Sequence, residues 1–118
     1  MGKLTTHVLD TALGKPAPGV AIELYAVGNG NTTLLGRTTT NADGRCDRPL
    51  LEGGEFKPGT YELVFYMGDY FRRTGGTVLA SNPFVDAVPI RFGVADADAH
   101  YHVPLLVSPW SWSTYRGS

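Results

Sequence analysis

The chain has 118 residues, of which 42% are hydrophobic and 18% charged, and its ten basic and eleven acidic residues give a formal net charge of -1. This length predicts one globular domain over residues 1–118 with a buried core. The balanced charge, the lack of a basic stripe and the lack of an apolar run near ~20 residues exclude nucleic acid and membrane as expected partners.

Short segments in which apolar and polar residues alternate recur along the chain, separated by turns rich in Gly, Pro and Asn. A period of two is typical of half-buried β-strands. The segment Asp69–Thr74 lacks the alternation and predicts a short helix. Eight strands in a chain of this length predict two packed antiparallel sheets, an all-β sandwich. The predicted strands are Leu4–Asp10, Val20–Val27, Thr33–Thr39, Arg45–Arg48, Tyr61–Phe65, Val88–Val94, Tyr101–Ser108 and Ser111–Arg116.

Strand parity sorts the side chains of the first strand and of the late strand, because residues i and i+2 point to the same side. His7 and Leu9 share one face of the first strand. On the late strand an apolar row points into the core, which sends His100, His102 and Leu106 outward. Apolar residues among histidines on an outer face favour coverage by another subunit. The aromatic residues between positions 110 and 115 favour an oligomer as well, since Trp and Tyr are enriched at interfaces.

Three separated motifs follow one another along the chain. They are Leu4–Asp10 (LTTHVLD), Asn41–Arg45 (NADGR) and His100–Pro109 (HYHVPLLVSP), the last leading into the ending Tyr115–Ser118 (YRGS). Together they resemble the motifs of 5-hydroxyisourate hydrolases, the enzyme branch of the transthyretin family, and the resemblance covers nearly all of the chain. It implies a transthyretin-like sandwich of two four-stranded sheets with one short helix. It also implies a homotetramer with sites in a channel between dimers, and neither a metal nor a cofactor.

The activity implied by this resemblance is hydrolysis of 5-hydroxyisourate to 2-oxo-4-hydroxy-4-carboxy-5-ureidoimidazoline, a step of urate and purine breakdown. Opening a cyclic amide requires a base for the attacking water, a positive group for the developing oxyanion and an acid for the leaving nitrogen. Imidazole suits the first and third tasks because its pKa is about 6.5, and arginine suits the second.

The resemblance assigns catalytic roles to His7, His102 and Arg45. His7 and His102 would activate water and transfer protons, and Arg45 would bind substrate and stabilise charge. Spacing does not choose between His100 and His102, which share a face; the resemblance selects His102 because it directly precedes Val103. Which of the two assigned histidines is the base stays open.

The chain end is expected to belong to the same site. The resemblance implies substrate-binding or supporting roles for Tyr115, Arg116, Gly117 and Ser118, and we expect Tyr115 to orient groups or to close the pocket. Parity would place Tyr115 and Gly117 on one face of a regular strand and the other two residues on the opposite face. The ending must therefore bend, or some of its residues support the site without contacting substrate.

The main alternative function is a non-catalytic carrier of transthyretin type that holds a small aromatic ligand between subunits. A metal site drawn from His100 and His102 with the nearby aspartates has too few placed ligands to be favoured. Cys46 is the only cysteine, so no internal disulfide is expected; neighbouring arginines favour a reactive thiol, but a small buried hydrophobe is the commoner role. The start of the sequence has no secretory apolar segment, which predicts a cytoplasmic protein, or a periplasmic one if a signal peptide has been removed.

Overall fold

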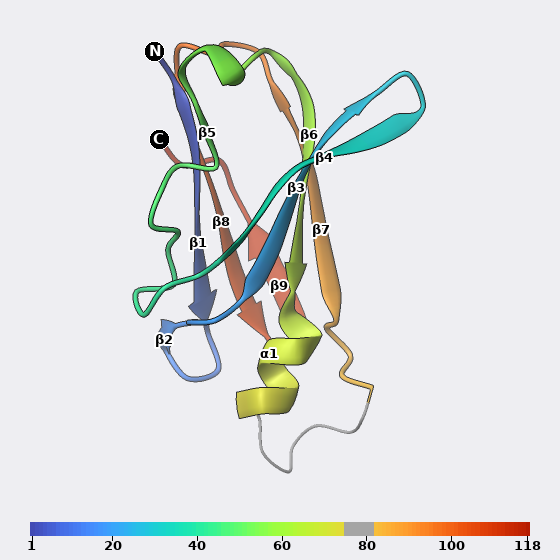
Figure 1. Cartoon of the computed structure of the whole chain (residues 1–118). Coiled ribbons are helices and arrows are strands. Elements are labelled where there is room, and N and C mark those ends of the chain that lie inside the picture. Colours follow the sequence, from blue (N-terminus) through green and yellow to red (C-terminus); the bar gives the residue numbers. More distant parts are fainter. Residues whose placement is uncertain (75–81) are drawn as a thin grey trace.

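The computed structural model describes residues 1–74 and 82–118. Within them the strands form two sheets that lie face to face, and one α-helix closes one end of the sandwich (Figure 1). None of the helices in these two segments is long and apolar enough to cross a membrane. The elements are β1 (Lys3–Asp10), β2 (Lys15–Pro16), β3 (Ala21–Gly28), β4 (Asn31–Thr39), β5 (Leu51–Glu52), a 3-10 turn η1 (Gly53–Glu55), β6 (Gly59–Tyr66), α1 (Met67–Thr74), β7 (Ala87–Val94), β8 (His100–Ser108) and β9 (Ser111–Thr114).

The sheet that carries the sequence motifs has the order β2-β1-β8-β9, with β5 also paired to β1, and the other sheet has the order β4-β3-β6-β7. β1 and β8 run parallel, and their register places Lys3 opposite His100 and Thr5 opposite His102. The other strand pairs are antiparallel. The prediction of two antiparallel sheets is therefore wrong at the β1–β8 pair, where the two strands run in the same direction. The start of the chain therefore lies directly beside its late strand, as the neighbouring ribbons of β1 and β8 show in Figure 1.

The core lies between the two sheets, and the strands that enclose it show the alternating burial that the sequence predicts. Along β1 every second residue from Leu4 to Asp10 is buried, while Thr5 and His7 are half-buried on the other face. On β8 the predicted apolar row is buried, from Tyr101 to Val107. The largest fully buried side chains are Phe65, Phe71, Leu4, Ile22, Leu63, Met67, Leu105, Val8, Val20, Val88 and Val107.

Seven of the eight predicted strands and the short helix are confirmed, with shifted ends. The strand predicted for Arg45–Arg48 is wrong: Arg45 forms an isolated bridge with His7, and the short strand lies at Leu51–Glu52. β9 ends at Thr114, before the predicted end at Arg116. Because β2 and β5 have two residues each, they are too short to show alternation. Together with β1, β8 and β9 they make this sheet five-stranded, where four strands were predicted.

A buried carboxylate joins the helix to the first strand. Asp10 is 2% exposed at the end of β1, and its Oδ2 accepts a hydrogen bond of 2.8 Å from the Tyr70 hydroxyl on α1. Its Oδ1 accepts from the backbone N–H groups of Ala12 and Leu13, at 3.0 and 3.1 Å. A buried carboxylate is stable only when its oxygens are paired in this way. The contact fixes α1 against the sheet that carries the candidate site.

Replacing Tyr70 by Phe should lower the free energy of unfolding by about 1–3 kcal/mol, because it leaves one oxygen of buried Asp10 without its donor. Urea unfolding at fixed protein concentration would measure the change. Tyr25→Phe is the matched control, since that hydroxyl donates to Glu23 on the outer face of the other sheet, and its loss should cost within about 0.5 kcal/mol. Equal losses in the two variants would contradict a structural role for the Asp10 contact.

Candidate active site

The turn Asn41–Arg45 presents Arg45 to the first strand. The Asn41 side-chain oxygen accepts hydrogen bonds from the backbone N–H groups of Asp43, at 2.9 Å, and Arg45, at 3.2 Å. Gly44 has a φ of +72°, and a β-carbon there would lie 2.5 Å from the Val8 carbonyl oxygen. Only glycine allows this close approach in a left-handed conformation. The turn therefore packs directly on β1, where Arg45 pairs with His7.

Two of the predicted catalytic residues come from β1 and β8, and their side chains lie on the same outer face. His7 is opposite Pro104 and His102 is opposite Thr5 in the parallel register, so the two histidines are diagonal neighbours. A hydrogen bond with the backbone of Asp43 raises the pKa of His7, which ties this ring to the same turn. The three predicted catalytic residues therefore meet although they lie in three distant segments.

An open pocket of about 420 Å³ lies beside these residues. Arg45 and His102 line it, and His7 does not, although His7 pairs with Arg45 and acts electrostatically on His102. The wall includes residues to which the sequence analysis gave no role, and only the register of β1 with β8 brings them together. The lining residues are Lys3, Thr5, Thr6, Arg45, Cys46, His100, His102 and Ser118.

The Thr5 hydroxyl bridges the two histidines of β8. Thr5 Oγ1 lies 2.8 Å from Nε2 of His100 and 2.8 Å from Nδ1 of His102. All three side chains are half-buried. The contact fixes the orientation of the His102 ring and leaves its Nε2 free of this interaction.

The last two residues of the chain join the site. The backbone of Gly117 pairs with that of His102, through Gly117 N–H to His102 O at 2.7 Å and His102 N–H to Gly117 O at 3.3 Å. A β-carbon on Gly117 would lie 3.1 Å from Cδ2 of the His102 ring, so the glycine allows the tail to pass close to the imidazole. Ser118 then reaches the pocket wall.

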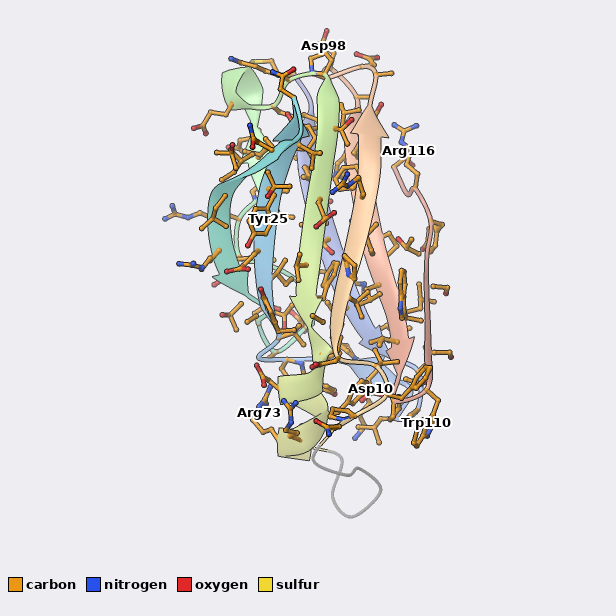
Figure 2. The ribbon with its side chains drawn as sticks, turned by 90° about the vertical axis from the view of Figure 1, so that its right-hand side faces the viewer. Asp10, Tyr25, Arg73, Asp98, Trp110 and Arg116 are labelled. Atoms are coloured by element: carbon orange, nitrogen blue, oxygen red, sulfur yellow. The ribbon has the colours of Figure 1, made fainter. Side chains whose placement is uncertain are left out.

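Tyr115 and Arg116 lie elsewhere within this single chain. They line a second cavity of about 240 Å³ between the sheets at β7 and β9, and Figure 2 shows Arg116 beside the β7 ribbon. The Arg116 guanidinium lies over the Tyr101 ring at 4.2 Å from its centroid and donates to the His100 carbonyl at 3.3 Å. The tail thus leaves strand geometry after Thr114, as parity required, and Arg116 anchors it.

Burial and positive charge hold both site histidines in the neutral form. Burial is the main cause that lowers the pKa of His7, and Arg45 lowers it further, against raising effects from the hydrogen bond with the Asp43 backbone and from the Asp43 charge. Burial also lowers the pKa of His102 most, followed by the charges of Arg45, His7 and His100. Since an ordinary imidazole has a pKa of about 6.5, a lowered pKa makes the neutral form the main one at pH 7 for both rings.

The sequence analysis also considered a reactive thiol at Cys46 and a metal site, and the structure favours neither. Burial is the main cause that raises the pKa of the Cys46 thiol, so its resting form is the weakly reactive thiol, and the arginine activation considered from the sequence is not seen. Across residues 1–74 and 82–118, no three His, Cys, Asp or Glu side chains gather as ligands for a metal ion. The pocket wall carries imidazole, guanidinium, hydroxyl, amino and thiol groups.

Comparison with known proteins gives one consistent family. The model of the HIUase/Transthyretin family matches residues 4–117. The 5-hydroxyisourate hydrolase 2 of Rhizobium meliloti (strain 1021) is 59% identical over 117 residues, which cover 99% of this chain and 97% of that protein.

Solved structures agree with the sequence relatives. The structure of Klebsiella pneumoniae 5-hydroxyisourate hydrolase matches with a TM-score of 0.80 and 35% identity over 100% of both chains. The crystal structure of (S)-allantoin synthase matches with a TM-score of 0.92 and 51% identity over 99% of this chain. The present chain spans only 44% of that synthase chain.

Replacing Arg45 by Met should raise the pKa of both His7 and His102, because it removes a positive charge that disfavours the imidazolium. Titration of the ring signals by NMR would measure both values. Arg91→Met removes the same charge from the outer face of the other sheet, where Arg91 pairs with Glu62, and should leave both histidines unchanged. Identical titration curves for wild type and Arg45→Met would show that the guanidinium does not act on the imidazoles.

Proposed function

Because this chain belongs to the HIUase/Transthyretin family, we propose that it is a 5-hydroxyisourate hydrolase whose reaction is carried by His7, His102 and Arg45. The hydrolase activity rests on full-length relatives of that name. The observation that supports the residue assignment is the convergence of two neutral imidazoles and one guanidinium on a single open face. This set suits the opening of a cyclic amide by water.

The reaction divides into two proton transfers around one tetrahedral intermediate. One neutral histidine takes a proton from water while the water oxygen bonds to the amide carbonyl carbon. The carbonyl oxygen becomes an oxyanion, which Arg45 stabilises with its permanent charge and planar set of donors. When the intermediate collapses, the carbon–nitrogen bond breaks and the leaving nitrogen takes a proton from the N–H of the second histidine, which is reprotonated by the proton that the first histidine took from water. The products carry a new carboxyl group and a new N–H.

The chain end supports this site in two ways. Gly117 clamps the backbone of His102, and Ser118 borders the pocket, so both are placed to position the ring or to contact substrate. Arg116 supports them from behind through the His100 carbonyl and the Tyr101 ring. Tyr115 lines the other cavity within one chain, so a part in substrate binding would have to come from a rearrangement or from another subunit.

We further propose that the chain associates into a homotetramer. Exposed aromatic residues near the end of the chain support association: Trp110 is 60% exposed, Trp112 42% and Tyr115 60%. Figure 2 shows Trp110 at the end of the sandwich that also carries α1. Exposed aromatic groups of this size favour burial against another subunit. The number four comes from the resemblance described in the sequence analysis.

The assay for the activity follows the ultraviolet absorbance of freshly generated 5-hydroxyisourate with and without protein. The wild-type chain should accelerate its loss, and His7→Ala or His102→Ala should lower kcat/KM by roughly two to four orders of magnitude, the usual contribution of a positioned acid or base. Arg37→Met, which removes a 70% exposed guanidinium paired with Glu23 on the other sheet, is the control for general damage. A histidine variant with the wild-type rate would remove that residue from the mechanism. Binding or protection of the substrate without accelerated loss would instead identify a carrier.

Replacing Gly117 by Ala should lower kcat about tenfold to a hundredfold, because the new methyl group presses on the His102 ring and displaces it from its productive position. Steady-state kinetics would measure the change. Gly28→Ala is the matched control, since a β-carbon there meets no atom within 4 Å. Unchanged kinetics in Gly117→Ala would show that the tail does not position His102.

A further inference from the structure

Thr5 lies between two histidines, and the proposed mechanism gives Thr5 no role. Its Oγ1 is 2.8 Å from Nδ1 of His102 and 2.8 Å from Nε2 of His100. Both distances are those of good hydrogen bonds. The contact is made across the parallel β1–β8 pair, where the backbone register itself holds Thr5 opposite His102.

A hydroxyl has one proton, and this limits the protonation states of the two rings. Thr5 can donate to only one of the nitrogens that face it, so at least one of the two must carry its own N–H and donate to Oγ1. The tautomer of His102 is therefore linked to that of His100 through a single oxygen. In the neutral ring of His102, the hydrogen bond made by Nδ1 decides whether Nε2, which faces the pocket, carries the proton.

The surroundings of His7 indicate which of the two arrangements the reaction needs. The hydrogen bond with the Asp43 backbone that raises the pKa of His7 suits a base, because it uses the ring N–H and leaves the other nitrogen of the neutral ring with a lone pair. The reaction then uses His7 as the base. The hydrolysis also requires a proton donor for the leaving nitrogen, and this task falls to His102.

We propose that Thr5 donates to Nδ1 of His102 and accepts from the Nε2–H of His100, so that neutral His102 presents Nε2–H to the pocket as the proton donor for the leaving nitrogen. The proton that His102 gives is replaced by the proton that His7 takes from water. Thr5 and His100 are then positioning residues, which act through His102. The roles of base and acid in this inference rest on the proposed function. The chain of two hydrogen bonds is a property of the resting protein and can be tested without substrate.

The tail completes the support of this chain of groups. Gly117 bonds to both backbone groups of His102, and Arg116 bonds to the carbonyl of His100. The backbone positions of both histidines are thus fixed from the side of β8 that is away from β1, while Thr5 fixes their rings from β1. A side chain held on a regular strand and tied through a second hydrogen bond is the usual way to lock one tautomer.

The decisive measurement is the tautomer of His102 in the resting protein, read from the nitrogen chemical shifts of the labelled ring at a pH where it is neutral. Wild type should show a protonated Nε2 and an unprotonated Nδ1. Thr5→Val keeps the branched shape but removes the hydroxyl, and it should give a mixture of tautomers. Thr5→Ser should restore the wild-type spectrum. A wild-type ring with the proton on Nδ1, or a Thr5→Val spectrum equal to wild type, would overturn the inference.

Kinetics provide the second readout. Thr5→Val should lower kcat about tenfold to a hundredfold, as expected for loss of a group that orients a catalytic ligand, with a much smaller change in KM. Thr5→Ser should recover most of the rate. Thr114→Val is the matched control, because it removes another strand hydroxyl from the same sheet, one that donates to the Pro104 carbonyl at 2.7 Å. An equal loss of kcat in Thr114→Val would show that the Thr5 effect comes from general disturbance of the sheet.

His100 is tested by a double-mutant cycle. His100→Met removes the donor to Thr5 and should lower kcat less than Thr5→Val does, since Thr5 can still donate to His102. His100→Gln keeps an N–H near the Nε2 position and should recover the rate. Combined with Thr5→Val, His100→Met should add no further loss, because both act through one path. Additive losses would overturn the linkage.

The design separates this inference from the proposed function. If His102→Ala abolishes hydrolysis while Thr5→Val leaves both the tautomer and kcat unchanged, Thr5 has no positioning role and the hydrolase assignment stands. If His102→Ala retains the wild-type rate, the acid role of His102 fails, whatever the tautomer measurement shows.

Discussion

The parallel pairing of β1 with β8 is the interaction on which the candidate site depends. It places residues from the start of the chain beside residues of the late strand in a fixed register, with Thr5 opposite His102. Because side chains alternate along both strands, this register brings Thr5, His7, His100 and His102 to one outer face. A shift of one residue would turn the histidines of β8 into the core and its apolar row outward, which the hydrophobic effect forbids.

The two sides of that face contribute different parts of the chemistry. The turn Asn41–Arg45 brings a permanent charge, and the same charge, together with burial, lowers the pKa of both imidazoles. Neutral imidazoles can take up protons at pH 7, while the guanidinium remains available for an anionic intermediate. In the proposed mechanism one arginine both stabilises the oxyanion and keeps the proton acceptors neutral. This double effect requires that Arg45 lie close to both histidines.

The sequence predicted the long strands, the short helix and the face of each strand well, because alternation is a local property that the core enforces. It failed at the short pairings. Residues 45–48 have strand-like character, yet of these four residues only Arg45 pairs with β1, through an isolated bridge to His7. The bridge from Thr5 to His100 and His102 could not be predicted, because it depends on which strands are neighbours and in what direction. The split of the ending, with Gly117 and Ser118 in the site and Tyr115 and Arg116 at a second cavity, is likewise a tertiary property.

The distance along the chain between the partners has a consequence for how the site comes into being. Thr5 and His102 are separated by 97 positions, and no local segment can bring them together. Closing so long a loop costs conformational entropy that only the assembled core repays, so the β1–β8 ladder is expected among the slow, non-local steps of folding. During synthesis the edge of β1 that pairs with β8 stays unpaired until β8 has been made. Catalytic competence would therefore arise with the completed sandwich, and it would report the folding of the whole domain.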